Sequence, residues 1–120
     1  MKNVTILGAT EKEGRYAKKA QTLLMEHGYN VLPISVRFDK VLGVRTYKSV
    51  AEISEPIDTL TIYVNPRILA EQIDEIAGMQ IRRVIFNPGT ESPELEEKLK
   101  ASGKEVVHGC TIVMLNTGQF

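Results

Sequence analysis

The chain has 120 residues, of which 42% are apolar and 25% charged, and its 15 basic residues balance its 15 acidic residues to a net charge of zero. This length suits one domain, residues 1–120, that buries roughly two-thirds of the surface exposed by its unfolded chain. The balanced charge argues against broad electrostatic binding to nucleic acid or to an acidic membrane surface, so we expect neither as a partner.

Cysteine content and hydropathy predict a soluble, cytoplasmic protein. Cys110 is the single cysteine, so no intrachain disulfide forms, as is usual in a reducing compartment. No stretch approaches the ~20 apolar residues of a membrane span. The apolar run within the opening residues MKNVTILG is too short for a signal peptide.

Five short apolar runs, mostly of β-branched residues, predict buried parallel strands. The runs are residues 4–7, 31–36, 60–64, 84–86 and 106–107. Between them, residues 14–27 have apolar positions at helical spacing and end at Gly28, which allows a left-handed helix end. Strands that alternate with helices predict an α/β fold with a small, doubly wound, mainly parallel sheet.

Two further helices are predicted by their capping residues. One follows Asn65-Pro66, and its apolar face continues to Ala77. The other runs from Ser92-Pro93 to Ser102-Gly103, where the spacing of Glu94/Lys98 and Glu96/Lys100 favours a solvated face. Residues 37–56 have no long periodic element, so we expect a long loop with a short helical turn near residues 50–53.

The first strand leads into ILGATEKEGRYA, which has features of a phosphate-binding turn. Gly8 allows a tight turn, Thr10 offers a hydroxyl, and Lys12 and Arg15 add positive charge before the helix. A plain strand-to-helix turn with Thr10 as a local cap explains the same residues. Neither the G-x-G-x-x-G spacing of dinucleotide sites nor the Lys-Ser/Thr pair of a P-loop is present.

The second loop carries a base where dinucleotide-binding domains usually carry an acid. Arg37 follows Ile34-Ser35-Val36 at the end of the second strand. A guanidinium in this place suits a phosphorylated ribose, which both NADP and coenzyme A carry. A solvent-facing loop arginine is the alternative interpretation of Arg37.

Taken together and in order, six segments resemble the CoA-binding domain family, whose Rossmann-like fold also forms the amino-terminal part of succinyl-CoA synthetase α subunits and of ADP-forming acyl-CoA synthetases. The segments are LGAT, GYNVLPIS, VLGVRTYKSVAEI, PIDTLTIYVNP, VIFNPGTES and VVHGCTIVML. They cover nearly the whole chain and are most similar to the stand-alone members. The resemblance implies a five-stranded sheet with helices on both faces that binds coenzyme A at its carboxyl edge.

The resemblance also implies which residues bind the cofactor. The first loop would hold a phosphate, with a basic residue just after it, and Arg37 would meet the adenosine end. Tyr47 matches the tyrosine of an L-G-x-x-x-Y pattern, two Asn-Pro loops line the edge, and a cysteine often follows the last strand. The implied residues are Gly8, Ala9, Thr10, Arg15, Arg37, Tyr47, Asn65, Pro66, Asn87, Pro88, Gly89 and Cys110.

The sequence departs from the family pattern near the first loop. Family members often carry Ser where this chain has Thr10, and another Ser where it has Tyr16 and Ala17, so a second hydroxyl contact is in doubt. Glu11 and Glu13 add negative charge beside the expected phosphate. If their side chains do not point away into solvent, each should weaken binding, by no more than roughly 1 kcal/mol for an exposed carboxylate.

The sequence predicts no catalytic residue and no metal ligand. His27 is expected to cap the end of the first helix. His108 has no acid nearby in the sequence, which favours a structural or ligand-lining role over catalysis. Cys110 has no neighbour that would lower the pKa of its thiol, so a redox role is disfavoured.

Non-catalytic binding of coenzyme A or an acyl-CoA is therefore the expected function. One alternative is an NADP-linked or other nucleotide-dependent enzyme, and another is a subunit that docks onto a separate ATP-binding partner. The terminal run, residues 111–115, is apolar enough to pair with another chain, as in a homodimer, although we expect it to complete the protein's own core.

Overall fold

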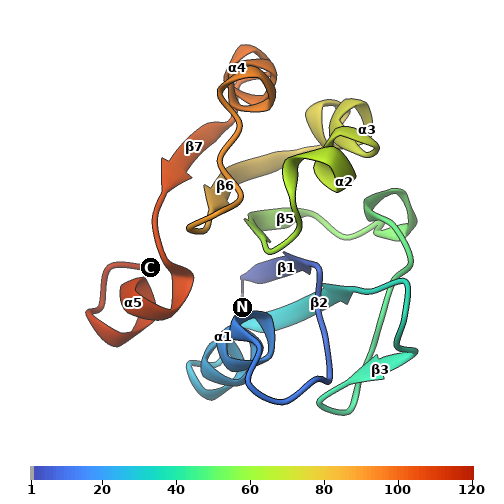
Figure 1. Ribbon diagram of the computed structural model, residues 1–120, viewed down its shortest axis with the longest axis vertical. Helices are drawn as coiled ribbons and strands as arrows, with labels where there is room; N and C mark the ends of the chain where they lie inside the picture. The colour runs from blue at the N-terminus through green and yellow to red at the C-terminus, as the bar shows by residue number, and fades with distance from the viewer. Residues whose placement is uncertain (1) are drawn as a thin grey trace.

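Five parallel strands form the central sheet of the computed structural model, which describes residues 2–120 (Figure 1). The strand order is β2-β1-β5-β6-β7. The strands are β1 (Asn3–Leu7), β2 (Asn30–Ile34), β5 (Ile57–Ile62), β6 (Ile81–Phe86) and β7 (Glu105–His108). This architecture confirms the predicted α/β fold.

Helices cover both faces of the sheet (Figure 1). On one face lie α1 (Tyr16–Glu26) and α5 (Thr111–Asn116), which contact each other. On the other face lie α2 (Pro66–Ala70), α3 (Ile73–Gly78) and α4 (Pro93–Ala101). Each face has its own apolar core, because successive side chains of a strand point to opposite sides. In β1, Val4 and Ile6 join the core under α1, whereas Leu7 joins the core under α2 and α3.

The capping residues have the predicted roles. The Asn65 side chain accepts a hydrogen bond from the Ile68 amide at the start of α2, and Ser92 does the same for Leu95 in α4. His27 ends α1, with its Nδ1 2.8 Å from the Leu23 carbonyl oxygen. The predicted single helix after Pro66 instead breaks at residues 71–72 into α2 and α3, and the Gln72 side chain there accepts a hydrogen bond from the Val50 amide.

The segment between β2 and β5 is more regular than the sequence indicates. It contains the predicted helical turn, η1 (Val50–Glu52), but also a hairpin of β3 (Lys40–Val41) and β4 (Val44–Arg45). Strands of two residues are too short to give a recognisable period, which is why the hairpin escapes prediction. β2 ends at Ile34, before the predicted Val36, because the chain bends at residues 36–37.

The terminal run of residues 111–115 is helical and forms most of α5. Ile112 and Leu115 are buried, and Leu115 packs with Leu24 and Ala17 of α1. The run therefore completes the core of its own chain, as expected. Within residues 2–120, no helix has the length and apolarity needed to cross a membrane.

Candidate functional site

A cleft of about 510 Å³ lies at the carboxyl edge of the sheet, in front of β1, β2 and β5. It is lined by residues from the three loops that follow these strands. The order of the strands reverses here, since β1 connects to β2 on one side while the later strands lie on the other. Loops diverge at such a point and leave a crevice, where open α/β sheets generally bind their ligands.

Gly8 lets the loop after β1 approach the loop after β5 closely. Its φ is 99°, and a Cβ atom there would lie 2.9 Å from Val64 Cγ1 and 3.0 Å from the Tyr63 carbonyl oxygen. Only glycine tolerates both this positive φ and the lack of space for a Cβ atom. The amides of Gly8 and Ala9 both donate to the Ile34 carbonyl oxygen, at 3.2 and 2.9 Å. These two amides therefore hold the loop against β2 and leave anion contacts to the residues that follow.

Those residues form an anion-binding arrangement at the start of α1. The Thr10 hydroxyl oxygen accepts a hydrogen bond from the Lys12 amide at 3.1 Å, which leaves its own proton free to donate. No side chain caps α1, and its first turn has no acidic residue. The amides and the positive end of the dipole thus face the cleft together with Lys12 and Arg15.

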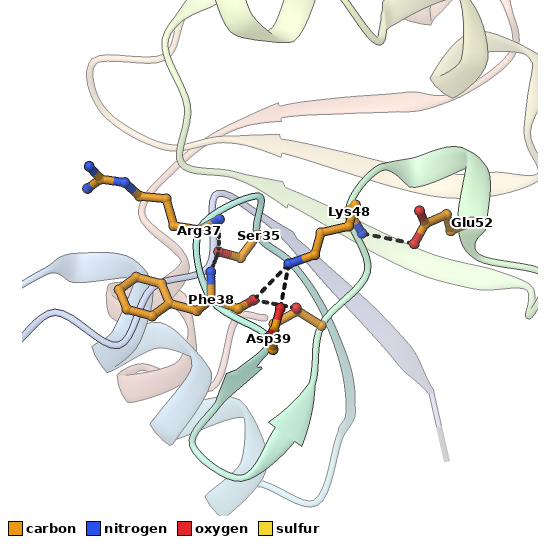
Figure 2. Close-up of polar contacts among 7 residues, drawn as sticks. Ser35, Arg37, Phe38, Asp39, Lys48 and Glu52 are labelled. Atoms are coloured by element: carbon orange, nitrogen blue, oxygen red, sulfur yellow. Dashed lines mark hydrogen bonds and ion pairs between the residues drawn. The ribbon is translucent and has the colours of Figure 1, made fainter.

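Arg37 lies in a braced loop but keeps a free side chain. The buried Ser35 hydroxyl accepts hydrogen bonds from the amides of Arg37 and Phe38, at 3.3 and 3.2 Å. Lys48 Nζ lies 3.1 Å from Asp39 Oδ1 and helps to hold the same loop. Figure 2 shows the Arg37 guanidinium pointing away from this cluster. Within residues 2–120, no carboxylate pairs with Arg37 or Arg15.

Glu11 and Glu13 are both engaged by other groups of the protein. The Glu11 carboxylate accepts a hydrogen bond at 3.0 Å from the amide of Leu42, at the tip of the β3–β4 hairpin. Leu42 has a φ of 51°, in the left-handed region that disfavours bulky residues. Glu13 forms an ion pair with Lys18. Glu11 is thus a brace between the first loop and the hairpin, and Glu13 is neutralised on the surface.

Apolar side chains form the walls of the cleft, and reasoning from the sequence missed them as site residues. Val36 and Tyr16 are 78% and 73% exposed, and Ile68 and Phe38 also line the cleft. Burial raises the pKa of Tyr63 to about 12, so this tyrosine is a neutral phenol at physiological pH. Exposed apolar side chains around a polar floor are typical of sites for cofactors.

A family model described as the CoA binding domain matches residues 2–116. The chain belongs to the CoA-binding domain family. The match confirms the resemblance that the six sequence segments indicate, and it includes every residue that forms the cleft.

Solved structures of similar proteins share this fold closely. The crystal structure of an uncharacterised protein is 43% identical and superposes with a TM-score of 0.93, covering 100% of this chain and 98% of that one. A protein from Thermus thermophilus is 30% identical with a TM-score of 0.91, covering 99% and 90%.

Curated relatives are of two sizes. An ADP-forming acetate–CoA ligase of Methanocaldococcus jannaschii is 31% identical in an alignment of 108 residues that covers 86% of this chain but 15% of the ligase. The uncharacterised Bacillus subtilis protein YneT is 23% identical over 88% of this chain and 78% of its own length. The chain thus matches a small part of the ligase and most of YneT.

The structure brings together in the cleft six of the residues that the family resemblance implies. These are Gly8, Ala9, Thr10, Arg15, Arg37 and Asn65. Pro66 follows directly as the first residue of α2. Tyr47 lies apart, with its backbone bonded to β2 and its hydroxyl 3.2 Å from Glu55 Oε2. Its contact with a ligand stays a prediction.

The remaining implied residues lie further along the same edge, after β6 and β7. Asn87 is buried, and its side chain makes three hydrogen bonds: Nδ2 donates to Thr61 and Ile62, and Oδ1 accepts from the Thr111 amide. Pro88 and Gly89 are exposed, and Cys110 is half-buried at the start of α5. Asn87 therefore holds this part of the edge rigid, while its neighbours present their surface to solvent.

His108 has an acidic partner that its sequence neighbourhood does not reveal. Its Nε2 forms a hydrogen bond with Glu96 Oε1, although the two residues belong to β7 and α4. Glu96 is 5% exposed, so the prediction that it faces solvent and pairs with Lys100 is wrong. Lys100 pairs with Glu97 instead. The i,i+4 pattern failed because the first turn of α4 packs beside the end of β7, which gives Glu96 a closer hydrogen-bonding partner.

Within residues 2–120, no cluster of three or more His, Cys, Asp or Glu side chains could hold a metal ion. The polar groups of the cleft are cations, amides and hydroxyls. Such a set can bind and orient an anionic ligand, and the cleft itself contains no paired acid and base for proton transfer.

Proposed function

We propose that this protein binds coenzyme A, or an acyl-CoA, in the cleft in front of β1, β2 and β5. The observation that carries the proposal is the pair Arg15 and Arg37, which flank the uncapped start of α1 and have no carboxylate partner among residues 2–120. Cations left unpaired around a concave surface favour a ligand with several negative charges. Membership of the CoA-binding domain family supports coenzyme A as that ligand.

The charges of the cleft match the distribution of phosphate in coenzyme A. The pyrophosphate would lie at the start of α1, where Thr10, Lys12 and Arg15 face the cleft. The phosphorylated ribose would meet Arg37, whose guanidinium can bind phosphate with two parallel hydrogen bonds. Val36, Phe38 and Ile68 would contact the adenine ring and the first part of the pantetheine arm.

The rest of the arm would extend along the carboxyl edge toward β6 and β7. There Pro88, Gly89 and Cys110 present exposed or half-buried surface, and the bonds of Asn87 fix the loop. Tyr47 and Pro66 would act from beside the cleft. In this proposal the protein is a cytoplasmic binding module for a small molecule.

Isothermal titration calorimetry with coenzyme A, dephospho-CoA, NADP, NAD and ATP tests the proposal. We expect coenzyme A to bind, and dephospho-CoA to bind more weakly because it lacks the ribose phosphate. The absence of heat with millimolar coenzyme A, together with an unchanged melting temperature, would refute coenzyme A binding. Preferential binding of NADP would instead support the nucleotide-dependent enzyme.

The variant Arg37→Ala should weaken coenzyme A binding by about 1–3 kcal/mol, through loss of a charge-assisted contact. Its binding of dephospho-CoA should hardly change, since that ligand lacks the group that Arg37 contacts. Arg67→Ala is the matched control, because Arg67 is an exposed arginine of α2 that does not line the cleft. Equal losses for both ligands would mean that Arg37 does not contact the ribose phosphate.

The match to a small part of acetate–CoA ligases favours a second candidate function, in which this chain docks onto a separate ATP-binding subunit. That candidate also requires coenzyme A binding. Size-exclusion chromatography with light scattering, with and without coenzyme A, first separates a monomer from a homodimer. Co-expression with an ATP-binding subunit encoded beside the protein's own gene should then yield a stable complex if docking occurs.

A further inference from the structure

Glu96 and His108 form a hydrogen-bonded pair at the same edge of the sheet as the cleft. Glu96 lies in the first turn of α4 with a side chain that is 6% exposed. One carboxylate oxygen, Oε2, accepts a hydrogen bond from the Ser92 amide at 2.9 Å, and the other contacts His108 Nε2. The carboxylate is thus fixed at both oxygens, and it fixes the imidazole in turn.

This contact determines which ring nitrogen of His108 carries the proton. A carboxylate only accepts hydrogen bonds, so Nε2 must be the donor, and in the neutral imidazole Nδ1 then has a lone pair. The side chain is 60% exposed, and its ring packs edge-on against Phe86, with centroids 6.3 Å apart. Within residues 2–120, no group hydrogen-bonds Nδ1. The ring is oriented on one side and presents a proton acceptor on the other.

We propose that His108 accepts the proton of a thiol on the bound ligand, with Glu96 as the positioning residue. The inference rests on the proposed binding of coenzyme A, whose pantetheine arm ends in a thiol, and it goes beyond a purely binding role. In this step the S–H bond breaks, the proton moves to Nδ1 and the electron pair stays on sulfur. The resulting imidazolium keeps its Nε2–H bond to the Glu96 carboxylate.

The chemical benefit is that the thiolate, rather than the thiol, is the nucleophile. A thiolate formed at this edge would attack the acyl carbon of a second substrate such as an acyl phosphate, forming the C–S bond of a thioester while the C–O bond breaks and inorganic phosphate leaves with the bonding electron pair. A buried carboxylate that orients an imidazole, which in turn activates a nucleophile, is the arrangement that proteins use for this purpose. An imidazole with a free lone pair suits this role near neutral pH.

The position of His108 along the edge agrees with this role. His108 ends β7, which lies two strands beyond β5, and adjacent strands are ~4.8 Å apart, so β7 is roughly 10 Å from β5, the strand at the near side of the cleft. The exposed residues Pro88 and Gly89 lie on the loop after β6, between them. The long pantetheine arm of coenzyme A, bound by its phosphates in the cleft, can cover this separation.

Alkylation of coenzyme A by iodoacetamide near neutral pH tests the proposal. The alkylated coenzyme A is counted by chromatography, so that modification of Cys110 does not contribute. With coenzyme A saturated by the protein, we expect alkylation on the order of ten-fold faster than for free coenzyme A, as a one-unit fall in the pKa of the thiol would give. His108→Asn, measured with all of the coenzyme A bound to the protein, should remove the acceleration.

His27→Asn is the matched control, because His27 is the other histidine of the chain and lies at the end of α1. It should leave the acceleration unchanged. Coenzyme A that binds but is alkylated no faster than free coenzyme A would overturn the role of His108 and leave the binding function intact. Coenzyme A that does not bind would overturn the binding function, and this inference with it.

The tautomers of the two histidines provide a readout that a purely packing role for Glu96 would not change. Long-range ¹H–¹⁵N spectra should show the proton of His108 on Nε2 and that of His27 on Nδ1, which donates to the Leu23 carbonyl oxygen. Glu96→Gln preserves an acceptor for the Ser92 amide but can donate its amide to Nε2. The proton of His108 should then shift to Nδ1, and the acceleration should be lost. An Nδ1–H tautomer in the wild-type protein would refute the proposal.

Discussion

The two edges of the sheet carry hollows of similar size but opposite organisation of charge. The hollow at the amino edge has a volume of about 590 Å³, against about 510 Å³ for the cleft at the carboxyl edge. At the amino edge, Arg82 makes two hydrogen bonds to the Asp58 carboxylate, at 2.8 and 3.1 Å, and one to Glu105 at 3.4 Å. At the carboxyl edge, Arg15 and Arg37 have no such partners within residues 2–120.

The pairing of charges, and not the volume of the hollow, therefore distinguishes the candidate site from the hollow at the amino edge. An arginine that already binds a carboxylate gains little from a phosphate, because the new contact replaces an existing one. An arginine held beside helix amides without a partner gains the whole contact. The amino edge is accordingly a stabilising structure, and the unpaired arginines support the proposal that a ligand binds at the carboxyl edge.

The largest expected effect comes from breaking the close approach of loops at the carboxyl edge. Gly8→Ala places a Cβ 2.9 Å from Val64 Cγ1 and 3.0 Å from a backbone oxygen, at a residue with φ of 99°. We expect a loss of about 3 kcal/mol of folding free energy, from strain and steric overlap together. Thermal and urea unfolding measure it.

Gly14→Ala provides the control for backbone strain alone. Gly14 also has a positive φ, of 80°, but a Cβ atom there would meet no atom within 4 Å. The Gly14→Ala variant should lose about 1 kcal/mol of folding free energy. Equal losses for the two variants would mean that the approach of Gly8 to Val64 is not a constraint on this loop.

The ion pair at the amino edge should produce a pH-dependent stability of about 2 kcal/mol. The Arg82 guanidinium lowers the pKa of Asp58 from its ordinary value of 3.8 to about 2. A depressed pKa in the folded state stabilises the protein above the unfolded pKa, and this contribution disappears as the pH falls from about 4 toward 2. Urea unfolding of the wild type and of Asp58→Asn across this range measures it.

The two proteins should differ by about 2 kcal/mol at neutral pH and converge as the carboxylate is protonated. Glu105→Gln is the matched control, because Glu105 is 58% exposed and contacts Arg82 at 3.4 Å. It should cost no more than ~1 kcal/mol, as exposed pairs do. A difference between wild type and Asp58→Asn that stays constant with pH would refute the electrostatic cause.

Much of the fold, and the polar half of the cleft, could be predicted because the signals are local. The apolar run before Gly8 fixes a strand and its turn, Asn65 and Ser92 mark helix starts, and a base after β2 indicates a phosphorylated ligand. The order of these loops also suffices to identify the family. Local signals of this kind also locate the site, because the carboxyl ends of parallel strands all lie at the same edge of the sheet.

Contacts between distant segments could not be predicted in the same way. The spacing of Glu96 and Lys100 predicts a solvated helix face, but the burial of Glu96 beside His108 depends on how α4 packs on β7. The walls of the cleft, such as Val36 and Ile68, are ordinary apolar residues until the loops meet. The role of Glu11 cannot be predicted because its partner, Leu42, lies 31 residues away in a hairpin too short to recognise.

The smallest expected effects distinguish the two glutamates of the first loop, which look alike in the sequence. Glu11→Ala removes the acceptor of the Leu42 amide and should cost about 1 kcal/mol. Glu11→Gln keeps an acceptor and should cost less. Glu13→Gln should change stability by no more than ~0.5 kcal/mol, because the Glu13 side chain is 91% exposed.

Hydrogen exchange at the Leu42 amide gives the sharpest measurement of this difference. Exchange should accelerate in Glu11→Ala and stay near the wild-type rate in Glu13→Gln. Leu42 has a strained left-handed backbone conformation, so we expect the hairpin tip to open more often when its hydrogen bond to Glu11 is lost. An unchanged exchange rate in Glu11→Ala would mean that the hairpin holds itself closed, and that the first loop and the hairpin are independent parts of the carboxyl edge.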